Sequence, residues 1–506
     1  MKRNKSNGSS MGNYMKRSVT VMALAALFIV TACSSGAKEA ATDGTGEKPS
    51  IEIVLNNAGR KFPEGMDENK NPYIDYIREN TNMDIKLTTP PADGYGEALN
   101  VIMASGDLPD MILSYDPNWF ESYVRQKALT PLNDLIDQYG QNLKKNIPEE
   151  AWKTVTVDGK IYAIPSLNPI PGNEIIFARK DWLDKLGLKA PKTLEEYKNV
   201  MSAFAQEDPD GNGKNDTFGL ILQENLGKTA PFIGAWGIQR GQWTERDGKL
   251  VMSSTLPEMK EALAYLADLY KEKLIDPEWA LNKMANVDEK VASGKVGLFS
   301  GNWYDTRGPI LTNQKNDANA EWITLEYPTG PDGKQGTWGN NYVSGYNVIP
   351  ITSKNPDAVI RMLDFMIGDG YRTLVLGFEG EVWSTQDGKV VTNFDEHNKH
   401  IYRQTLSEAI VPFEAEVSRD RLDSLGMEFK LNKIIDQINT VAIRNQYLGV
   451  PTAGMGKYGP KLGKMENEIF TKIIMGDLPL DAFDQFVEDW KKNGGEEITN
   501  EVNQSN

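Results

Sequence analysis

Short apolar stretches alternate with amphipathic stretches along the first part of this chain. The apolar segments at 51–55, 83–87 and 111–113 have the length and composition of buried strands. Between them, apolar residues recur at helical spacing in 73–77 and 99–103. This order predicts a β-α-β-α-β unit with a mostly parallel sheet, and alternating strands and helices continue beyond it, so the fold class is α/β.

The chain begins with a basic segment and an apolar run. Five Lys and Arg residues precede the run at 19–30, which ends at Thr31-Ala32-Cys33. This order is typical of a secretory signal peptide, and the run is shorter than the roughly 20 residues of a membrane-spanning helix. Val30-Thr31-Ala32-Cys33 resembles a bacterial lipobox. We therefore expect removal of residues 1–32 and lipidation of Cys33, the only cysteine, with palmitate among the acyl chains. The alternative is an ordinary secretory signal with a stray cysteine.

The chain beyond the leader is acidic and begins with a polar segment. Residues 33–49 are small and polar, as in a flexible tether, and the body from residue 50 is long enough for two or more domains. Removal of the leader changes the formal charge from -16 to -21, because five basic and no acidic residues leave with it. Such an acidic body is unsuited to binding nucleic acid or an anionic lipid surface. We expect it at the extracellular face of the membrane, held only by its lipid.

Several segments carry a resemblance to a known family. They are SGDLPD at 105–110, DGKIYAIP at 158–165, ARKDWLDKLGL at 178–188, PKTLEEY at 191–197 and GLFSGNW at 297–303. In this order they resemble the extracellular solute-binding lipoproteins of bacterial ABC importers, and among these the large oligosaccharide-binding subgroup. The resemblance covers nearly the whole mature chain.

The resemblance implies a two-lobed periplasmic-binding-protein-like fold with a hinge and a central ligand cleft. The N-terminal lobe is expected at 50–165 and 303–370, and the C-terminal lobe at 166–302 and 371–495. A polar tail is expected at 496–506. The chain would cross between the lobes after Pro165, near 301–303 and after the helix 356–366.

The function implied by the resemblance involves no catalysis. Such a protein captures an oligosaccharide by lobe closure and delivers it to the membrane subunits of an ABC permease. We expect the chain to act as a monomer.

A loop with the spacing of an EF-hand comes after the predicted helix near residue 200. Its candidate ligands, at loop positions 1, 3, 5, 7 and 9, are Asp208, Asp210, Asn212, Lys214 (through its carbonyl) and Asp216. Gly213 stands at position 6, where the loop must turn sharply. Position 12 is Gly219 instead of glutamate, and Thr217 stands where related binding proteins can place a ligand. We expect a structural calcium ion here; the alternative is an Asp/Asn/Gly turn that binds no metal.

Sugars are held by aromatic platforms with amide and carboxylate groups around them. The chain has eleven tryptophans, several of them beside polar residues. Candidate ligand-binding residues are Asn57, Trp119, Trp236, Asn302, Trp303, Tyr342, Glu379 and Trp383. Trp303 and Trp383 are the expected platforms, because the resemblance places their segments at the cleft. The alternative for any tryptophan is core packing, to which we assign Trp182 and Trp490.

Two other classes of protein stay open at this point. A surface glycoside hydrolase or polysaccharide lyase would need paired carboxylates, and Glu379 and Glu381 would face the same side of a strand. His397 and His400 are the only histidines and have no cysteine nearby, which disfavours a zinc site and a Ser-His-Asp triad. A peptide or lipid receptor is the third class.

Overall fold

The computed structural model describes residues 48–505 except 173, 413–415 and 426–428. The expected leader, the lipidation site Cys33 and most of the expected tether lie outside the described residues. The part from Lys48 onward is one compact unit. Within the described ranges, no helix is both long and apolar enough to cross a membrane.

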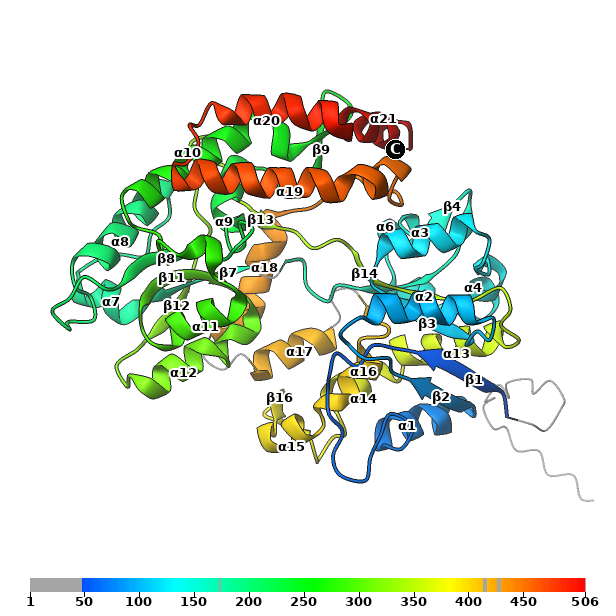
Figure 1. The fold of residues 1–506 in the computed structure, drawn as a ribbon. Coiled ribbons are helices and arrows are strands. Elements are labelled where there is room, and N and C mark those ends of the chain that lie inside the picture. Colours follow the sequence, from blue (N-terminus) through cyan, green and yellow to red (C-terminus); the bar gives the residue numbers. More distant parts are fainter. Residues whose placement is uncertain (1–47, 173, 413–415, 426–428, 506) are drawn as a thin grey trace, which may run out of the picture. The chain divides into compact units, whose positions relative to one another are not determined.

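The first lobe contains a five-stranded sheet in the order β2-β1-β3-β14-β6 (Figure 1). The strands are β1 (Ser50–Val54), β2 (Asp84–Thr88), β3 (Met111–Ser114), β6 (Ile164–Leu167) and β14 (Val343–Val348). β1 pairs in parallel with β2 and β3, whereas β14 runs antiparallel to β3 and β6. With α1 (Pro72–Thr81) and α2 (Tyr95–Ser105) between them, the first three strands confirm the predicted β-α-β-α-β unit.

Local sequence explains the limits of α1. Pro72 stands in its first turn, and the Asn71 side chain accepts hydrogen bonds from the amides of Tyr73 and Ile74. The helix ends at Asn82, whose φ of 52° is the left-handed conformation that asparagine tolerates.

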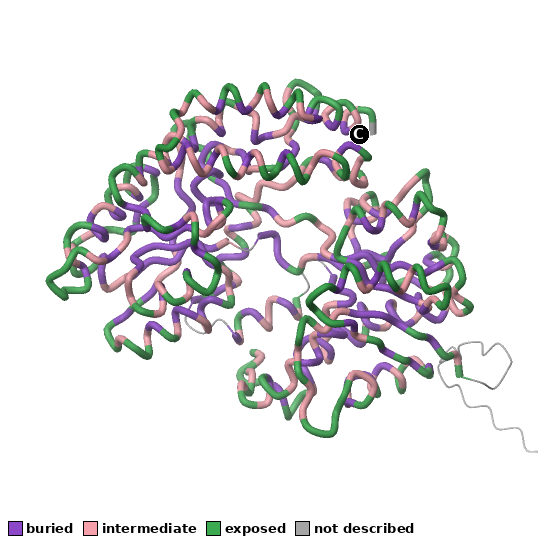
Figure 2. The backbone as a smooth tube through the Cα atoms, in the orientation of Figure 1, coloured by how far each residue is buried: buried purple, intermediate pink, exposed green. Residues whose placement is uncertain are grey.

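Buried residues, purple in Figure 2, gather along the strands of both lobes. Alternate residues of the first sheet enter two hydrophobic cores: Ile53 and Met111 belong to one core, whereas their neighbours Val54 and Ile112 belong to the other. The short elements of this lobe are α3 (Pro117–Arg125), α4 (Asn133–Tyr139), α5 (Gln141–Asn146), α6 (Glu149–Lys153), β4 (Thr156–Val157), β5 (Lys160–Ile161), α13 (Pro356–Ile367), α14 (Tyr371–Leu376), β15 (Trp383–Gln386), β16 (Lys389–Thr392), α15 (Phe394–Lys399), η5 (Ile401–Arg403) and α16 (Gln404–Ser407).

The second lobe contains a four-stranded sheet in the order β12-β7-β11-β8. The strands are β7 (Ile175–Arg179), β8 (Phe218–Ile221), β11 (Val296–Gly301) and β12 (Trp322–Leu325). β11 is parallel to β8 and antiparallel to β7. All six residues of β11 and all five of β7 are buried, as expected for central strands covered on both faces.

Helices from two parts of the sequence complete this lobe (Figure 1). They and the short elements beside them are α7 (Lys180–Lys185), α8 (Leu194–Gln206), α9 (Ala230–Ile233), η1 (Gly234–Trp236), β9 (Trp243–Arg246), β10 (Lys249–Met252), η2 (Ser253–Thr255), α10 (Pro257–Lys271), η3 (Trp279–Leu281), α11 (Met284–Ala292), η4 (Trp303–Thr306), α12 (Pro309–Asn316), α18 (Leu431–Val441), α19 (Ala453–Met475), α20 (Ala482–Trp490), a π-helical turn (Lys491–Gly495) and α21 (Glu496–Ser505). One large core joins the sheet to α8, α10, α18 and α19.

The chain crosses between the lobes three times. The first crossing lies at 168–174, close to the expected place after Pro165. The second lies at 326–342 and contains β13 (Thr337–Trp338), which pairs in parallel with β17 (Ala442–Ile443). The third includes α17 (Glu416–Leu425), whose Leu422 joins the second core.

The expected domain boundaries are wrong for two segments. Residues 303–325 belong to the second lobe instead of the first, because β12 pairs with β7 along its whole length. Residues 371–411 belong to the first lobe instead of the second, because Leu374, Tyr402 and Leu406 are buried in its core.

The expected polar tail at 496–506 is also wrong, since α21 covers most of it. Ile498 and Val502 stand four residues apart and are both buried. On the same helix, the Asn503 side chain exchanges two hydrogen bonds with the backbone of Leu250 in β10. A single apolar face with a period of four is easily missed among so many polar residues.

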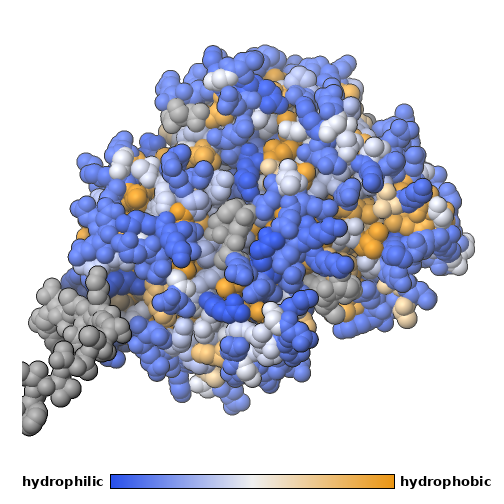
Figure 3. Space-filling view, turned by 180° about the vertical axis from the view of Figure 1, so that it is seen from behind, coloured by the Kyte–Doolittle hydropathy of each residue, from blue (hydrophilic) through white to orange (hydrophobic). Residues whose placement is uncertain are grey.

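Figure 3 shows one face of the molecule, where hydrophilic residues cover most of the surface and hydrophobic ones gather in small separate areas. This fits the strongly acidic composition.

Candidate binding site

A cavity of about 890 Å³ is lined by residues from both lobes. The first lobe contributes the segments after β1 and β3, and the second contributes η4, which comes directly after β11. Helices α14 to α17 close another side. The polar and aromatic lining residues are Asn56, Arg60, Tyr115, Trp303, Tyr304, Arg307, Ser344, Tyr371, His397, Asn398, Gln404, Ser407, Glu408, Ser418 and Arg421. Ligands of α/β proteins bind at such carboxyl ends of strands.

The turn after β1 positions Arg60. The Asn57 side chain accepts a hydrogen bond from the amide of Gly59, and the amide of Arg60 donates to the Asn57 carbonyl. Arg60 Nη2 then forms an ion pair with Glu408 at 2.6 Å. Asn57 itself does not line the cavity; it holds the turn that presents Arg60 to it.

Helix η4 presents the aromatic side of the cavity. Asp305 is buried, and its carboxylate accepts a hydrogen bond at 2.8 Å from the amide of Asn302, which caps the helix. The rings of Trp303 and Tyr304 lie 5.6 Å apart and nearly perpendicular, and Tyr304 is 51% exposed. Asn302 therefore positions Trp303 and does not line the cavity itself.

Two further arginines stand against aromatic rings. The Arg421 guanidinium lies 5.4 Å from the centre of the Trp303 ring, and that of Arg307 lies 4.2 Å from the Phe394 ring. Burial lowers the pKa of both arginines. Both still carry charge at neutral pH, because free arginine has a pKa above about 12.

The same arginines act on His397. Its imidazole is buried, and Nδ1 accepts a hydrogen bond from Arg403 Nη2 at 3.1 Å. Burial, and then the charges of Arg403, Arg421 and Arg307, lower its pKa to about 3. His397 is thus neutral at every physiological pH, with Nδ1 as an acceptor instead of a protonated donor.

The other expected platform, Trp383, does not line the cavity. It is 5% exposed, belongs to a small hydrophobic core with Tyr371 and Val382, and donates from Nε1 to the Gly377 carbonyl at 2.9 Å. Its prediction as a ligand platform is wrong, because the strand β15 turns it towards α14. Glu379 is exposed in the turn before it, and it does not line the cavity either.

Trp119 and Trp236 are core residues as well. Trp119 packs on Tyr123 at 4.6 Å in one core of the first lobe. Trp236 is buried in the second lobe and donates from Nε1 to Glu261 at 2.9 Å. Both therefore pack in a hydrophobic core, which was the alternative to ligand binding for any of the tryptophans.

Tyr342 lines a second cavity of about 390 Å³, together with Trp243, Tyr346, Arg444 and Tyr447. The Arg444 guanidinium lies 5.4 Å from the centre of the Tyr342 ring. Of the eight candidate ligand-binding residues, only Trp303 lines the larger of these two cavities between the lobes. A cavity of about 1120 Å³ lies within the second lobe, and none of the eight residues lines it.

Sequence reasoning missed Arg60, Tyr304, Arg307 and Arg421. Tyr304 and Arg307 lie within four residues of Trp303, so the neighbourhood of that tryptophan was the available signal. Arg421 stands in a charged helix, where nothing in the sequence separates it from its exposed neighbours.

The loop between α8 and β8 gathers the expected calcium ligands. The Asp208 carboxylate accepts hydrogen bonds from the amides of Asn212 and Gly213, each at 3.0 Å. The Asn212 side-chain amide donates to Asp210 at 2.7 Å and to Asp216 at 3.0 Å. The three carboxylates are thus linked through Asn212 and Gly213, but among the described residues they do not form a group whose ligand atoms all lie within 4.8 Å of one another. A cation would need a rearrangement of the loop, with the Asn212 amide turning its oxygen inwards.

Two features around this loop bear on calcium binding. Burial and the neighbouring carboxylates of Asp216 and Asp208 raise the pKa of Asp210. Asp216 also forms an ion pair with Lys295, which would compete with a cation. The hydroxyl of Thr217 is buried and donates to the Phe204 carbonyl at 2.7 Å, so it is not placed as a ligand.

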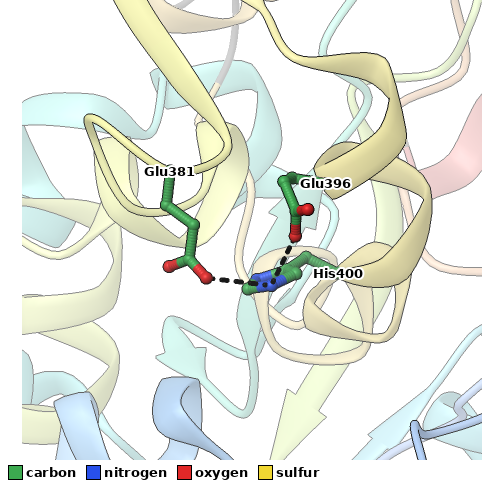
Figure 4. Close-up of side chains that lie close together, drawn as sticks. All are labelled: Glu381, Glu396 and His400. Carbon is green, nitrogen blue, oxygen red and sulfur yellow. Dashed lines mark ion pairs between the residues drawn. The ribbon is translucent and has the colours of Figure 1, made fainter.

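A second group of possible metal ligands consists of Glu381, Glu396 and His400 (Figure 4). His400 Nε2 lies 3.5 Å from Glu381 and 4.0 Å from Glu396, and Nδ1 is 2.8 Å from the Tyr73 hydroxyl. Zinc accepts such nitrogen and oxygen ligands. Sequence reasoning disfavoured a metal at the histidines and did not find this group, because only the turn before β15 brings Glu381 to α15. Lys399 pairs with Glu396 at 2.7 Å and would compete with a cation.

With this geometry established, comparison with known proteins decides the family. Residues 57–373 match the family described as bacterial extracellular solute-binding protein. The chain belongs to this family. The resemblance noted in the sequence is thereby confirmed, and with it the two-lobed α/β fold.

Individual relatives cover almost the entire chain. Lipoprotein LipO of Bacillus subtilis is 27% identical over 97% of this chain and 98% of its own length. The polygalacturonan/rhamnogalacturonan-binding protein YtcQ of the same organism is 26% identical over 98% of this chain and 99% of its own. The crystal structure of the alginate-binding protein AlgQ2 without calcium ion has a TM-score of 0.68 at 20% identity, covering 91% of this chain and 98% of that chain.

Proposed function

We propose that this chain is the substrate-binding protein of an ABC importer, which captures an oligosaccharide in the larger cavity and delivers it to the permease. The observation that carries the proposal is the cavity of about 890 Å³, which is lined by both lobes and has Trp303 and Tyr304 in its lining. Its size lies in the range of small-ligand sites, which is roughly 300–1,000 Å³. The names of YtcQ and AlgQ2, which refer to polysaccharides, support the same ligand class.

The mechanism is a population shift. A ligand that contacts η4 in one lobe and the turn after β1 in the other binds best when both are close, so it favours the closed arrangement. The three crossing segments would serve as the hinge, and β13 in the second of them is held by its pairing with β17, which follows α18 of the second lobe. The permease would recognise the closed form.

The residues that line the cavity do not favour a hydrolase or a lyase. Hydrolysis of a glycosidic bond needs two carboxyl groups on either side of it. Among the described lining residues, Glu408 is the only acidic one, and it is paired with Arg60. Glu379 and Glu381 are exposed in a turn outside this lining.

Three finer statements belong to the same proposal. We propose that Cys33 carries the lipid that holds the protein at the extracellular face of the membrane, a view supported by the likeness to a protein named lipoprotein LipO. We propose a structural calcium ion in the loop 208–216, with Asp208, Asp210, Asn212, Lys214 and Asp216 as ligands. We also propose that the protein acts as a monomer.

The experiment that tests the function uses the purified mature protein and a panel of plant-derived oligosaccharides. We expect one or more of them to raise the melting temperature, with no new reducing ends after prolonged incubation. Release of reducing ends would favour the hydrolase. No stabilisation by any sugar would refute oligosaccharide capture.

A further inference from the structure

We propose that the oligosaccharide bound by this chain is acidic, with uronic acid carboxylates that pair with arginines of the larger cavity. The inference rests on the proposed function as an oligosaccharide receptor and adds the chemical class of the sugar.

The charge of the cavity is opposite to that of the whole protein. The chain has a formal charge of -16, yet the described residues around the cavity include Arg60, Arg307 and Arg421 against the single carboxylate of Glu408. The lining therefore carries about two positive charges in excess. In such an acidic protein, a neutral sugar gives no reason for this inversion, whereas an anionic ligand does.

The described residues neutralise these positive charges only in part. Arg60 pairs with Glu408 through Nη2, but its Nη1 is buried and has no hydrogen-bond partner. In the part of the chain that the structure describes, no ion pair involves Arg307 or Arg421; each faces an aromatic ring, and Arg421 is also attracted by the carboxylate of Glu408. Arg60, Arg307 and Arg421 are half-buried, and a partly desolvated charge is stabilised by a nearby anion, which a bound ligand would supply beyond the carboxylate of Glu408.

The low pKa of His397 is a consequence of burial and of the positive potential around it. Its low pKa is caused by burial first, and then by Arg403, Arg421 and Arg307. Arg403 is buried too and donates only to the carbonyls of Val375 and His400 and to His397. Behind the lining, Arg403 is thus a third arginine, after Arg307 and Arg421, for which the described residues provide no ion pair.

The arrangement suits a uronic acid residue in particular. Trp303 lines the cavity, where a sugar ring could stack on it, the Arg421 guanidinium lies 5.4 Å from the centre of its ring, and Arg307 stands at the end of the same short helix. The planar fork of arginine pairs with a planar carboxylate through two parallel hydrogen bonds, so a ring on Trp303 could place its carboxylate against a guanidinium.

The test compares matched acidic and neutral sugars by titration calorimetry. The probes are oligomers of three to six residues made from polygalacturonate, alginate and glucuronoxylan, each also converted to its carboxyl-reduced, neutral counterpart. We expect at least one acidic oligomer to bind at least roughly 10-fold more tightly than its reduced counterpart, since hydrogen bonds to charged groups are worth about this factor or more.

Substitutions test whether Arg307 and Arg421 bind the carboxylates of the sugar. Arg307→Gln and, separately, Arg421→Gln should weaken binding of the acidic oligomer roughly 10- to 100-fold and of its reduced counterpart by less than about 3-fold. Arg307→Lys keeps the charge and should retain part of the affinity. Arg361→Gln on α13, where Arg361 pairs with Asp357 at 2.8 Å, is the matched control and should bind like wild type. The melting temperature of each variant shows whether it folds.

The outcomes separate this inference from the proposed function. If neutral oligomers bind and acidic ones do not, or if an acidic oligomer and its reduced counterpart bind equally, the acidic ligand class is refuted while oligosaccharide capture stands. Binding of sulfated but not carboxylated sugars would likewise overturn the uronic acid assignment. If no sugar binds at all, both are refuted.

Discussion

The state of His397 can be tested by changing pH. Its pKa is about 3 in the folded protein, against 6.5 for a free imidazole, because it is buried and surrounded by Arg403, Arg421 and Arg307. Between these two values the unfolded chain binds a proton that the folded protein does not. The contribution of His397 to stability is therefore complete above pH 6.5 and is lost as the pH falls towards 3.

The size of the loss can be worked out from the two pKa values. At pH 5, an imidazole with an unfolded pKa of 6.5 favours unfolding by about 2 kcal/mol relative to pH 8. His397→Asn removes this titration and keeps an oxygen that can accept the hydrogen bond of Arg403. The difference in the free energy of unfolding between wild type and variant should therefore fall by about 2 kcal/mol from pH 8 to pH 5.

Two measurements check this prediction. The first is urea unfolding of both proteins at pH 8 and pH 5. The second is NMR of the histidine rings, which is simple because the chain has only two histidines. In a preparation without a histidine tag, the signal absent from His397→Asn should not titrate between pH 8 and 5. A pKa near 6.5 for that signal, with the same pH dependence of stability in both proteins, would refute the argument from the buried arginines.

The cavity, the acidic loop and the leader give three other predictions. Trp303→Ala should weaken oligosaccharide binding by about 1–3 kcal/mol with little change in stability, whereas Trp383→Ala should lower the free energy of unfolding by about 3–5 kcal/mol, as for other buried tryptophans. Calorimetry and thermal melting measure the two effects, and a Trp303 variant that is unstable but binds normally, with a Trp383 variant that is stable but binds weakly, would contradict the prediction. Removal of calcium with a chelator should lower the melting temperature, and Asp208→Ala with Asp210→Ala should abolish that response; an equal effect of chelator on both proteins would contradict the loop as its origin. Cys33→Ala should abolish labelling by a fatty acid analogue and release the protein from the membrane, and unchanged membrane retention would contradict lipid anchoring.

Regular, local patterns made much of the fold predictable. The first three strands and the helices between them could be assigned from apolar spacing alone, since each buries one clear face. The lobe boundaries were harder to predict, because β12 joins the second sheet only through pairing with β7, more than a hundred residues earlier in the sequence. Such non-local pairing leaves no periodic signal in the segment itself.

The residues of the binding site, too, could be predicted from the sequence only in part. Trp303 could be named from the sequence because it stands directly after a segment that the family resemblance places at the cleft. Trp383 was assigned wrongly, since its neighbours are polar and its burial depends on how β15 turns towards α14. The arginines could not be named at all. Whether Arg307 or Arg421 lacks a carboxylate partner is decided by tertiary contacts, and in sequence they look like any of the chain's other arginines.

The central claim is that an oligosaccharide occupies the cavity shared by the two lobes. A crystal structure of the mature protein with the oligosaccharide that stabilises it most tests this directly. We expect a sugar ring on Trp303 and polar contacts to residues of both lobes, Arg60 and Arg307 among them. A sugar bound in the second cavity beside Tyr342 and Arg444, with the larger cavity holding only solvent, would contradict it.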